Sequence, residues 1–189
     1  MIELAFRTAT ADDALCLGVL GTQVFLDTYA TGGIRPSLAR EVLAHFSTEA
    51  MARLLAAPDT VLLLAESQAH LVGFAQLAPG KGHARVQARA PVELARLYVQ
   101  EPFTGRGVGR ALLQQAEARM AAQGADVMWL TAWVGNARAL AFYPRQGYRE
   151  QGVTSYEFEG EAYENRLFAK PLGPGGGDGA AAARQESPG

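Results

Sequence analysis

Three glycines at alternate positions, Gly105, Gly107 and Gly109, form the segment of this sequence with the clearest chemical meaning. Glycine lets the backbone turn sharply, so that successive amide N–H groups can point at one spot. A helical pattern of apolar residues follows directly, and the N-terminus of a helix carries a partial positive charge. Such a loop can bind phosphate groups, and Arg106 and Arg110 would add charge-assisted hydrogen bonds.

Comparison with nucleotide-binding signatures narrows the type of phosphate ligand. No Gly-Lys-Ser/Thr sequence closes the loop, as a P-loop requires, which weakens a nucleoside triphosphate interpretation. The dinucleotide signature GxGxxG fails because Arg110 stands three residues after Gly107. The structural alternative is that the glycines only end a strand and allow close packing of the helix.

The elements that position this loop follow from the apolar periodicity of the chain. Alternation of apolar residues predicts strands, and a period near 3.6 predicts helices. Strands are predicted at residues 2–7, 61–66, 71–77, 93–99, 127–131, 148–158 and 163–170. Helices are predicted at residues 10–29, at 37–55 with a break near Ser47, at 110–120 and at 136–143. The glycine loop therefore joins a strand to a helix in an α/β domain.

The composition predicts one globular domain followed by a tail. The chain has 189 residues, of which 49% are hydrophobic and 19% charged, which is enough to bury a full core. Periodic segments run through residues 1–172 without a linker, so we expect a single domain there. Residues 173–189 are dominated by glycine, alanine and proline, and we expect a disordered tail.

Charge and cysteine content exclude several classes of partner. A net charge of −2 without a basic cluster argues against nucleic-acid binding. Cys16 is the single cysteine and no Cys/His cluster has zinc spacing, so we expect neither a disulfide nor a metal, and we expect Cys16 to pack in the core. The opening residues lack a signal-peptide profile and no apolar run reaches about 18 residues. These features predict a cytoplasmic protein without a membrane partner.

Two segments resemble motifs of the GNAT acyl-CoA N-acetyltransferases. Residues 93–113, ELARLYVQEPFTGRGVGRALL, resemble motif A of that superfamily, Q/R-x-x-G-x-G/A. Residues 136–143, NARALAFY, followed by Gly147 and Tyr148, resemble its N-x-x-A-x-x-F-Y-x-x-x-G-F segment. The resemblance extends over about residues 2–172. It implies the GNAT fold, an α/β (α+β) architecture with a mixed, mostly antiparallel central sheet, a splayed strand pair and flanking helices. LYV at residues 97–99 and WLTAWVGN at residues 129–136 are most similar to polyamine-acetylating bacterial members.

The resemblance implies acetyl-CoA as co-substrate and no metal. The pantetheine would lie on backbone groups of Leu97 and Val99, with the Val99 N–H polarising the thioester carbonyl. The pyrophosphate would lie on the amides of residues 104–109, and Asn136 would contact the pantetheine, cap the short helix, or do both. Thr104 stands where the family usually has Gln or Arg, so we expect weaker cofactor binding. The expected cofactor-binding residues are Leu97, Tyr98, Val99, Thr104, Gly105, Arg106, Gly107, Val108, Gly109, Arg110 and Asn136.

Acetylation of an amine also needs a base, because an alkylammonium group with a pKa near 10.4 must lose a proton before it can attack. Glu93 is the candidate base, since it lies fourteen positions before Gly107, the spacing of the catalytic glutamate in histone-acetylating members. The alternative is a strand-edge carboxylate paired with Arg96 or another arginine.

Departure of the CoA thiolate needs an acid, and Tyr143 matches the family's tyrosine. The alternative is an aromatic side chain that only packs in the core. Pro144 directly follows, and proline disfavours helical geometry in the residue before it, so the direction of the Tyr143 hydroxyl is open.

The resemblance implies transfer of the acetyl group to a primary amine of a small molecule, polyamine or amino-acid-like, by direct attack in a ternary complex. The alternatives are acetylation of a protein N-terminus or lysine, and a non-catalytic acyl-CoA-binding sensor. Residues 13–55 would form the acceptor side, where Asp27, Glu41 and Glu49 would suit a polycation if they faced inward. Tyr29, Trp133 and Tyr98 could line the acceptor pocket, although such aromatics are more often core. The apolar closing strands favour a homodimer.

Overall fold

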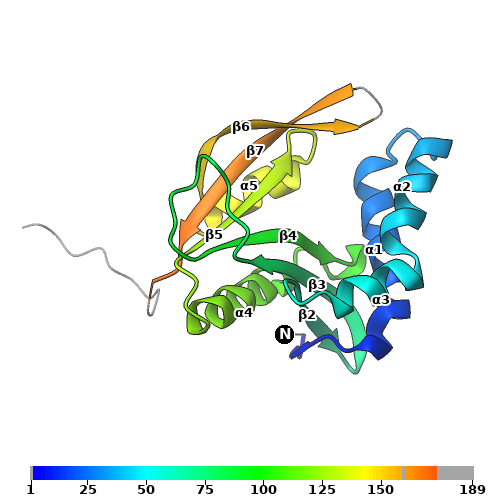
Figure 1. The fold of residues 1–189 in the computed structure, drawn as a ribbon. Coiled ribbons are helices and arrows are strands. Elements are labelled where there is room, and N and C mark those ends of the chain that lie inside the picture. Colours follow the sequence, from blue (N-terminus) through cyan, green and yellow to red (C-terminus); the bar gives the residue numbers. More distant parts are fainter. Residues whose placement is uncertain (1, 159–160, 174–189) are drawn as a thin grey trace, which may run out of the picture.

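The fold is seen in a computed structural model, which describes residues 2–158 and 161–173. A seven-stranded sheet with the order β1-β2-β3-β4-β5-β7-β6 forms its centre (Figure 1). The strands are β1 (Ala5–Thr8), β2 (Val61–Ser67), β3 (His70–Pro79), β4 (Pro91–Val99), β5 (Val127–Trp133), β6 (Arg149–Phe158) and β7 (Glu161–Pro171). Only β4 and β5 pair in parallel within the described part of the chain. The predicted mixed, mostly antiparallel sheet is confirmed, and the predicted tail lies outside the described residues from position 174 onward.

Five helices cover the two faces of this sheet. They are α1 (Ala14–Tyr29), α2 (Pro36–Phe46), α3 (Thr48–Ala56), α4 (Val108–Ala122) and α5 (Ala137–Arg145). The first three pack together against β2 and β3, where Leu64 and Phe74 are fully buried (Figure 1). The opposite core joins α4 and α5 to the sheet around Leu112 and Tyr143. Apolar side chains on both sheet faces thus hold one layer of strands between two layers of helices.

Capping residues explain where the N-terminal helices begin. Thr10 and Asp13 form a capping box around a short 3-10 turn, Ala11–Asp13, which leads into α1. The predicted break at Ser47 is confirmed, because Ser47 is extended and its side chain accepts a hydrogen bond from the Ala50 amide at 3.2 Å.

The predicted core position of Cys16 is wrong, since Cys16 is exposed. The buried stripe of α1 runs through residues 14, 17, 18, 20 and 21. Cys16 falls on the other side of the helix with Leu15 and Val19, which are also exposed.

The two central strands separate partway along their length. β4 pairs with β5 only over Pro91↔Val127, Val92↔Met128 and Glu93↔Trp129, whereas its pairing with β3 continues to Val99. From Leu94 onward, the edge of β4 that faces β5 has no strand partner (Figure 1). This is the splayed strand pair that the resemblance implied.

No helix in the described ranges is both long and apolar enough to cross a membrane. The same ranges contain no group of three or more His, Cys, Asp or Glu side chains that could hold a metal ion.

Candidate active site

A cleft of about 730 Å³ opens where β4 and β5 separate. Its walls come from the end of β4, the glycine loop, α5 with the turn before it, and the C-terminal half of α1. Nine of the expected site residues line it, namely Leu97, Tyr98, Val99, Thr104, Gly105, Gly107, Gly109, Arg110 and Asn136, and so does Tyr143. Glu93, Arg106 and Val108 do not line it. The structure thus brings together residues that lie up to 46 positions apart, from Leu97 to Tyr143.

Four residues of the glycine loop line this cleft, namely Gly105, Gly107, Gly109 and Arg110, and their amide groups are free. Gly105 and Gly107 have φ angles of 71° and 86°, a left-handed conformation that favours glycine over other residues. Gly107 is the N-cap of α4. The amides of residues 105–110 donate to no acceptor among the described residues, whereas Ala111 N–H already bonds to Gly107 O at 2.9 Å. Free N–H groups at a helix N-terminus make this loop an anion site.

Three residues of the glycine loop that were expected to bind the cofactor are placed differently from expectation. The amide row begins at Gly105, because the Thr104 N–H and hydroxyl both donate to the carbonyl oxygen of Glu101, at 3.0 and 2.9 Å. Val108 is 0% exposed as a whole residue and belongs to the core, so neither its side chain nor its backbone opens to the cleft. Arg106 is exposed outside the cleft, which leaves Arg110 as the loop arginine inside it.

The end of β4 divides its side chains between the two cores. Leu97 and Val99 pack on the α4 side. Tyr98 packs on the other face, with ring centroids 5.4 Å from Phe74 and 6.1 Å from Phe46, and burial raises the pKa of its hydroxyl to about 12. Tyr98 therefore stays neutral over the physiological pH range.

Asn136 is a helix cap at the edge of the cleft. Its side-chain oxygen accepts a hydrogen bond from the Ala139 amide at 3.0 Å, so the capping role is confirmed. Its amide nitrogen has no acceptor among the described residues, which leaves a donor for a ligand. Contact with the pantetheine stays a prediction.

Tyr143 lies in the last turn of α5 and is 8% exposed. Its ring packs edge-on against Tyr148 at 5.6 Å, and its hydroxyl has no hydrogen-bond partner within the described part of the chain. Burial, followed by the nearby Tyr29 and Tyr98, raises the pKa of Tyr143 well above its usual value. A neutral hydroxyl donor therefore stands at the cleft at neutral pH.

Pro144 does not break this helix. α5 continues to Arg145 with Pro144 inside it, so Tyr143 keeps helical geometry although proline disfavours that geometry in the residue before it. Because Pro144 lies in the last turn, its missing N–H removes only one helical hydrogen bond. The following chain satisfies the carbonyl of Tyr143, because Gln146 and Tyr148 donate to it at 2.9 and 3.2 Å.

Glu93 lies at the point where β4 and β5 part, but outside the cleft. Its carboxylate forms an ion pair with Lys81 Nζ at 2.6 Å, on the loop that joins β3 to β4. The alternative of an ion-paired carboxylate is thus observed, with a lysine in place of the arginine expected. The role of base stays a prediction.

An ion pair that the sequence did not predict links two walls of the cleft. Glu101, just after β4, accepts two hydrogen bonds from Arg138 of α5, at 2.7 and 3.0 Å. These bonds lower the pKa of Glu101. Arg138 lies inside the NARALAFY motif, but nothing in its spacing indicates a partner 37 residues away.

The end of α1 also takes part in the cleft, which the sequence motifs did not predict. Val24, Asp27, Thr28 and Tyr29 form a wall of the cleft. Of the three acids named for a polycation, Asp27 alone lines the cleft, while Glu41 pairs with His45 at 3.0 Å.

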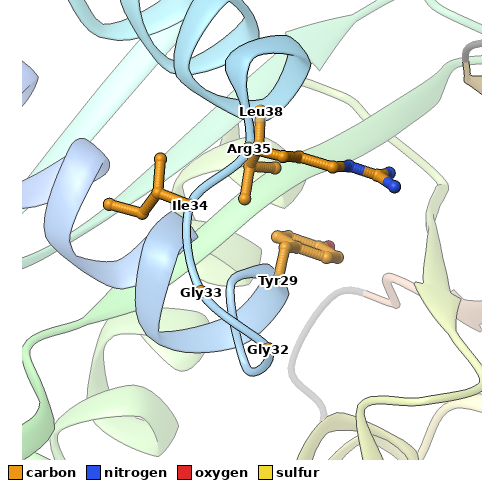
Figure 2. A pocket seen from close by; sticks show the side chains of 6 residues that line it. All are labelled: Tyr29, Gly32, Gly33, Ile34, Arg35 and Leu38. Atoms are coloured by element: carbon orange, nitrogen blue, oxygen red, sulfur yellow. The ribbon is translucent and has the colours of Figure 1, made fainter.

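A smaller pocket of about 440 Å³ adjoins the cleft at Tyr29, which lines both. Figure 2 shows the Tyr29 ring and the Arg35 side chain on one side of the loop between α1 and α2, while Ile34 points away. The Tyr29 ring centroid is 5.6 Å from that of Trp133 on β5. Tyr29 thus lies between the cleft and the smaller pocket, as expected for a residue that lines the acceptor site, whereas Trp133 lines neither.

Comparison with known proteins identifies the family. The model of the acetyltransferase (GNAT) family matches residues 33–148. An uncharacterized N-acetyltransferase of Mycobacterium tuberculosis is 30% identical over 135 residues, which cover 69% of this chain and 81% of the relative. A second relative, from Lactobacillus delbrueckii subsp. lactis, is 21% identical over 128 residues, covering 68% and 74%.

Solved structures share the fold. The PaiA N-acetyltransferase from Thermoplasma acidophilum in complex with coenzyme A has a TM-score of 0.69 and 21% identity, covering 90% of this chain and 99% of its own. The acetyltransferase YncA from Salmonella typhimurium with acetyl-CoA has a TM-score of 0.61 and 17% identity, covering 94% and 99%.

The splayed sheet and the loop of free amides define an acyltransferase architecture. The chain belongs to the GNAT acetyltransferase family and is an N-acetyltransferase of that family. The resemblance of its motifs to the GNAT family is confirmed, and the closer similarity to polyamine-acetylating members stays a prediction.

Proposed function

We propose that this protein transfers the acetyl group of acetyl-CoA to a primary amine of a small molecule, in a ternary complex. The observation that carries the proposal is the cleft, which joins the free edge of β4 to the unpaired amides of Gly105, Gly107, Gly109 and Arg110. An extended pantetheine arm can pair with the strand edge while a pyrophosphate lies on the loop. Two proteins of the same fold have coenzyme A or acetyl-CoA bound, which supports this donor.

The reaction needs no covalent enzyme intermediate in this proposal. The neutral amine nitrogen attacks the thioester carbonyl carbon, the N–C bond forms, and the C–S bond breaks to release the thiolate. A backbone N–H at Val99 would stabilise the oxyanion. Glu93 would accept, through water, the proton that the ammonium group of the acceptor loses before attack, and a second proton leaves the nitrogen to water as the amide forms. Cys16 lies outside the cleft residues, which supports direct attack.

Tyr143 would act on the leaving sulfur. Its raised pKa keeps it protonated, but it also makes complete transfer to a thiolate, whose own pKa is near 8.5, unfavourable. Tyr143 therefore donates a hydrogen bond that strengthens as negative charge develops on sulfur, and the thiolate takes its proton from water afterwards.

The direct test follows CoA thiol release from acetyl-CoA with amino acids, polyamines and peptide amines, with the acetylated product identified by mass. Release that depends on a small amine supports the proposal. Release with peptides alone would favour acetylation of protein termini or lysines. Binding of acetyl-CoA without release from any amine would indicate a sensor.

We further propose that the catalytic domain ends near residue 172, that the protein is cytoplasmic, and that it forms a homodimer. Light scattering of the purified chain tests the dimer.

A further inference from the structure

Arg96 stands on β4 between Glu93 and Tyr98 and is partly buried. Its guanidinium donates to Gln76 Oε1 of β3, and its Cζ lies 5.0 Å from the ring centroid of Phe46 on α2. The pairs Gln76↔Arg96 and Phe74↔Tyr98 share one face of the sheet, because they are two residues apart in register. This is the face that α1, α2 and α3 cover.

The contacts of Arg96 are neutral, which sets it apart from the other partly buried cations. Arg166, the other partly buried arginine in the described ranges, pairs with Glu150 at 3.0 Å and Glu164 at 3.1 Å. Lys170 likewise pairs with Glu117 at 2.7 Å.

Over residues 2–158 and 161–173, Arg96 has no carboxylate within ion-pair distance. An amide oxygen and an aromatic face offset only part of the cost of removing a guanidinium from water. The structure therefore holds a partly desolvated positive charge without a counter-ion.

This charge lies close to Tyr29 and Tyr98, two tyrosines that line the cleft. The positive charge of Arg96 acts against the rise that burial causes in the pKa of Tyr29 and of Tyr98. Tyr98 lines the cleft, and Tyr29 lines both the cleft and the smaller pocket. Arg96 lines neither pocket itself, and these two tyrosines connect it to them.

The neighbouring polar groups favour an anion at this place. The Arg96 guanidinium donates a hydrogen bond to the side-chain oxygen of Gln76. The Gln76 amide nitrogen therefore remains as a donor, and it has no acceptor among the described residues. The guanidinium has five N–H donors in a planar fork, of which Gln76 occupies part. The nearest acid along the strand, Glu93, is neutralised by Lys81.

We propose that Arg96 binds a carboxylate of the acceptor, so that the acceptor is an amino acid or a similar small molecule with both a primary amine and a carboxylate. This inference rests on the proposed function, which it narrows. A carboxylate supplies the missing counter-ion through charge-assisted hydrogen bonds. A polyamine would instead bring a second positive charge to a positive site.

The test compares each amino acid with two matched compounds, its amide and its decarboxylated amine, and includes spermidine. CoA release is measured for the wild type and for Arg96→Met, which keeps an apolar stem on Phe46 but removes the charge. Arg96→Lys keeps the charge without the fork, and Arg119→Gln, an exposed residue of α4 outside both pockets, is the control.

We expect the wild type to prefer the amino acid over its amide and amine. Arg96→Met should raise KM for the amino acid about 10- to 100-fold, as expected for loss of a hydrogen bond to a charged group, and barely change KM for the amide. The KM of Arg96→Lys for the amino acid should lie between those of the wild type and Arg96→Met. The dissociation constant of acetyl-CoA should not change in either variant. Equal turnover of amines without carboxylate, or an equal loss for every acceptor in Arg96→Met, would overturn the inference.

A binding experiment separates failure of this inference from failure of the proposed function. With CoA present, amino acids should raise the unfolding temperature of the wild type more than that of Arg96→Met, and amines at the same concentration should raise both by the same smaller amount. Such stabilisation without turnover of any amine would overturn the proposed function and support the Arg96 site. Absence of carboxylate-dependent stabilisation would overturn the Arg96 site whatever the turnover.

Discussion

Lys81 Nζ lies 2.6 Å from Glu93 Oε2, where β4 leaves its pairing with β5. The Lys81 side chain is 59% exposed and that of Glu93 is 15% exposed, so the lysine can swing into water while the carboxylate stays in place. The contact allows two roles for Glu93, one in an ion pair and one as a proton acceptor that Lys81 covers in the absence of substrate.

Substitutions of the two partners should separate these roles. If Glu93 is the base, Glu93→Gln should lower kcat by about 100-fold, whereas Lys81→Met should leave kcat within a few-fold. Steady-state CoA release measures both. The ion pair is mostly exposed on the lysine side, so neither change should cost more than about 1 kcal/mol of stability. Equal small effects of both changes on turnover would reduce Glu93 to an ion-pair partner.

Tyr143→Phe should lower kcat by about 100-fold and leave the dissociation constant of acetyl-CoA almost unchanged. The hydroxyl has no partner among the described residues, so its loss breaks no internal bond, and the ring packing on Tyr148 is kept. Turnover and a binding titration of the same preparation check this. An unchanged rate would remove Tyr143 from the mechanism.

Gly107→Ala should both destabilise the fold and weaken acetyl-CoA binding. With φ at 86°, an alanine there is strained by roughly 1–2 kcal/mol, which lowers the unfolding temperature by a few degrees. Relief of the strain would turn amides away from the anion site. Gly32→Ala is the matched control, because an added Cβ meets nothing within 4 Å and Gly32 has no positive φ. Equal unfolding temperatures and equal acetyl-CoA dissociation constants for the two variants would contradict the proposed role of Gly107 in the anion site.

Asp13 should link stability to acid pH. Hydrogen bonds from Arg7 at 2.7 and 2.8 Å are the main cause that lowers the pKa of Asp13 from 3.8 to about 2. A carboxyl whose pKa is lower in the folded state stabilises the fold above about pH 4 and loses this effect as pH falls through about 2.

Asp13→Asn should therefore lower the free energy of unfolding by about 1 kcal/mol at pH 7, a value reduced because the Arg7 side chain is 41% exposed. Unfolding temperatures measured from pH 7 to pH 2 should converge for the two proteins at the acid end. A constant difference across that range would assign the effect to the Thr10 cap instead.

The sequence predicts those parts of the fold that local pattern decides. Strands, helices, the break at Ser47 and the left-handed glycines of the loop follow from periodicity, capping and backbone freedom, and each is seen in the structure. The exposed side of α1 at Cys16 was mispredicted, because its helix is apolar on both sides.

Contacts between distant segments could not be predicted. The Glu101 carbonyl removes Thr104 from the amide row, and the partner of Glu93 comes from a loop rather than a neighbouring strand. The setting of Arg96 depends on Phe46, fifty residues earlier, which only the packing of α2 on the sheet brings close. Local pattern thus locates the phosphate loop, whereas tertiary packing determines the acceptor side.

The central claim is that acetyl-CoA binds in the cleft between β4 and β5, and thermal unfolding with and without acetyl-CoA tests it without knowledge of the acceptor. At a hundred times its dissociation constant, the ligand should add about 2.7 kcal/mol to the stability, which raises the unfolding midpoint by roughly 5–10 °C. The rise should shrink in Gly107→Ala at the same ligand concentration. A folded wild type with an unchanged midpoint would contradict the account.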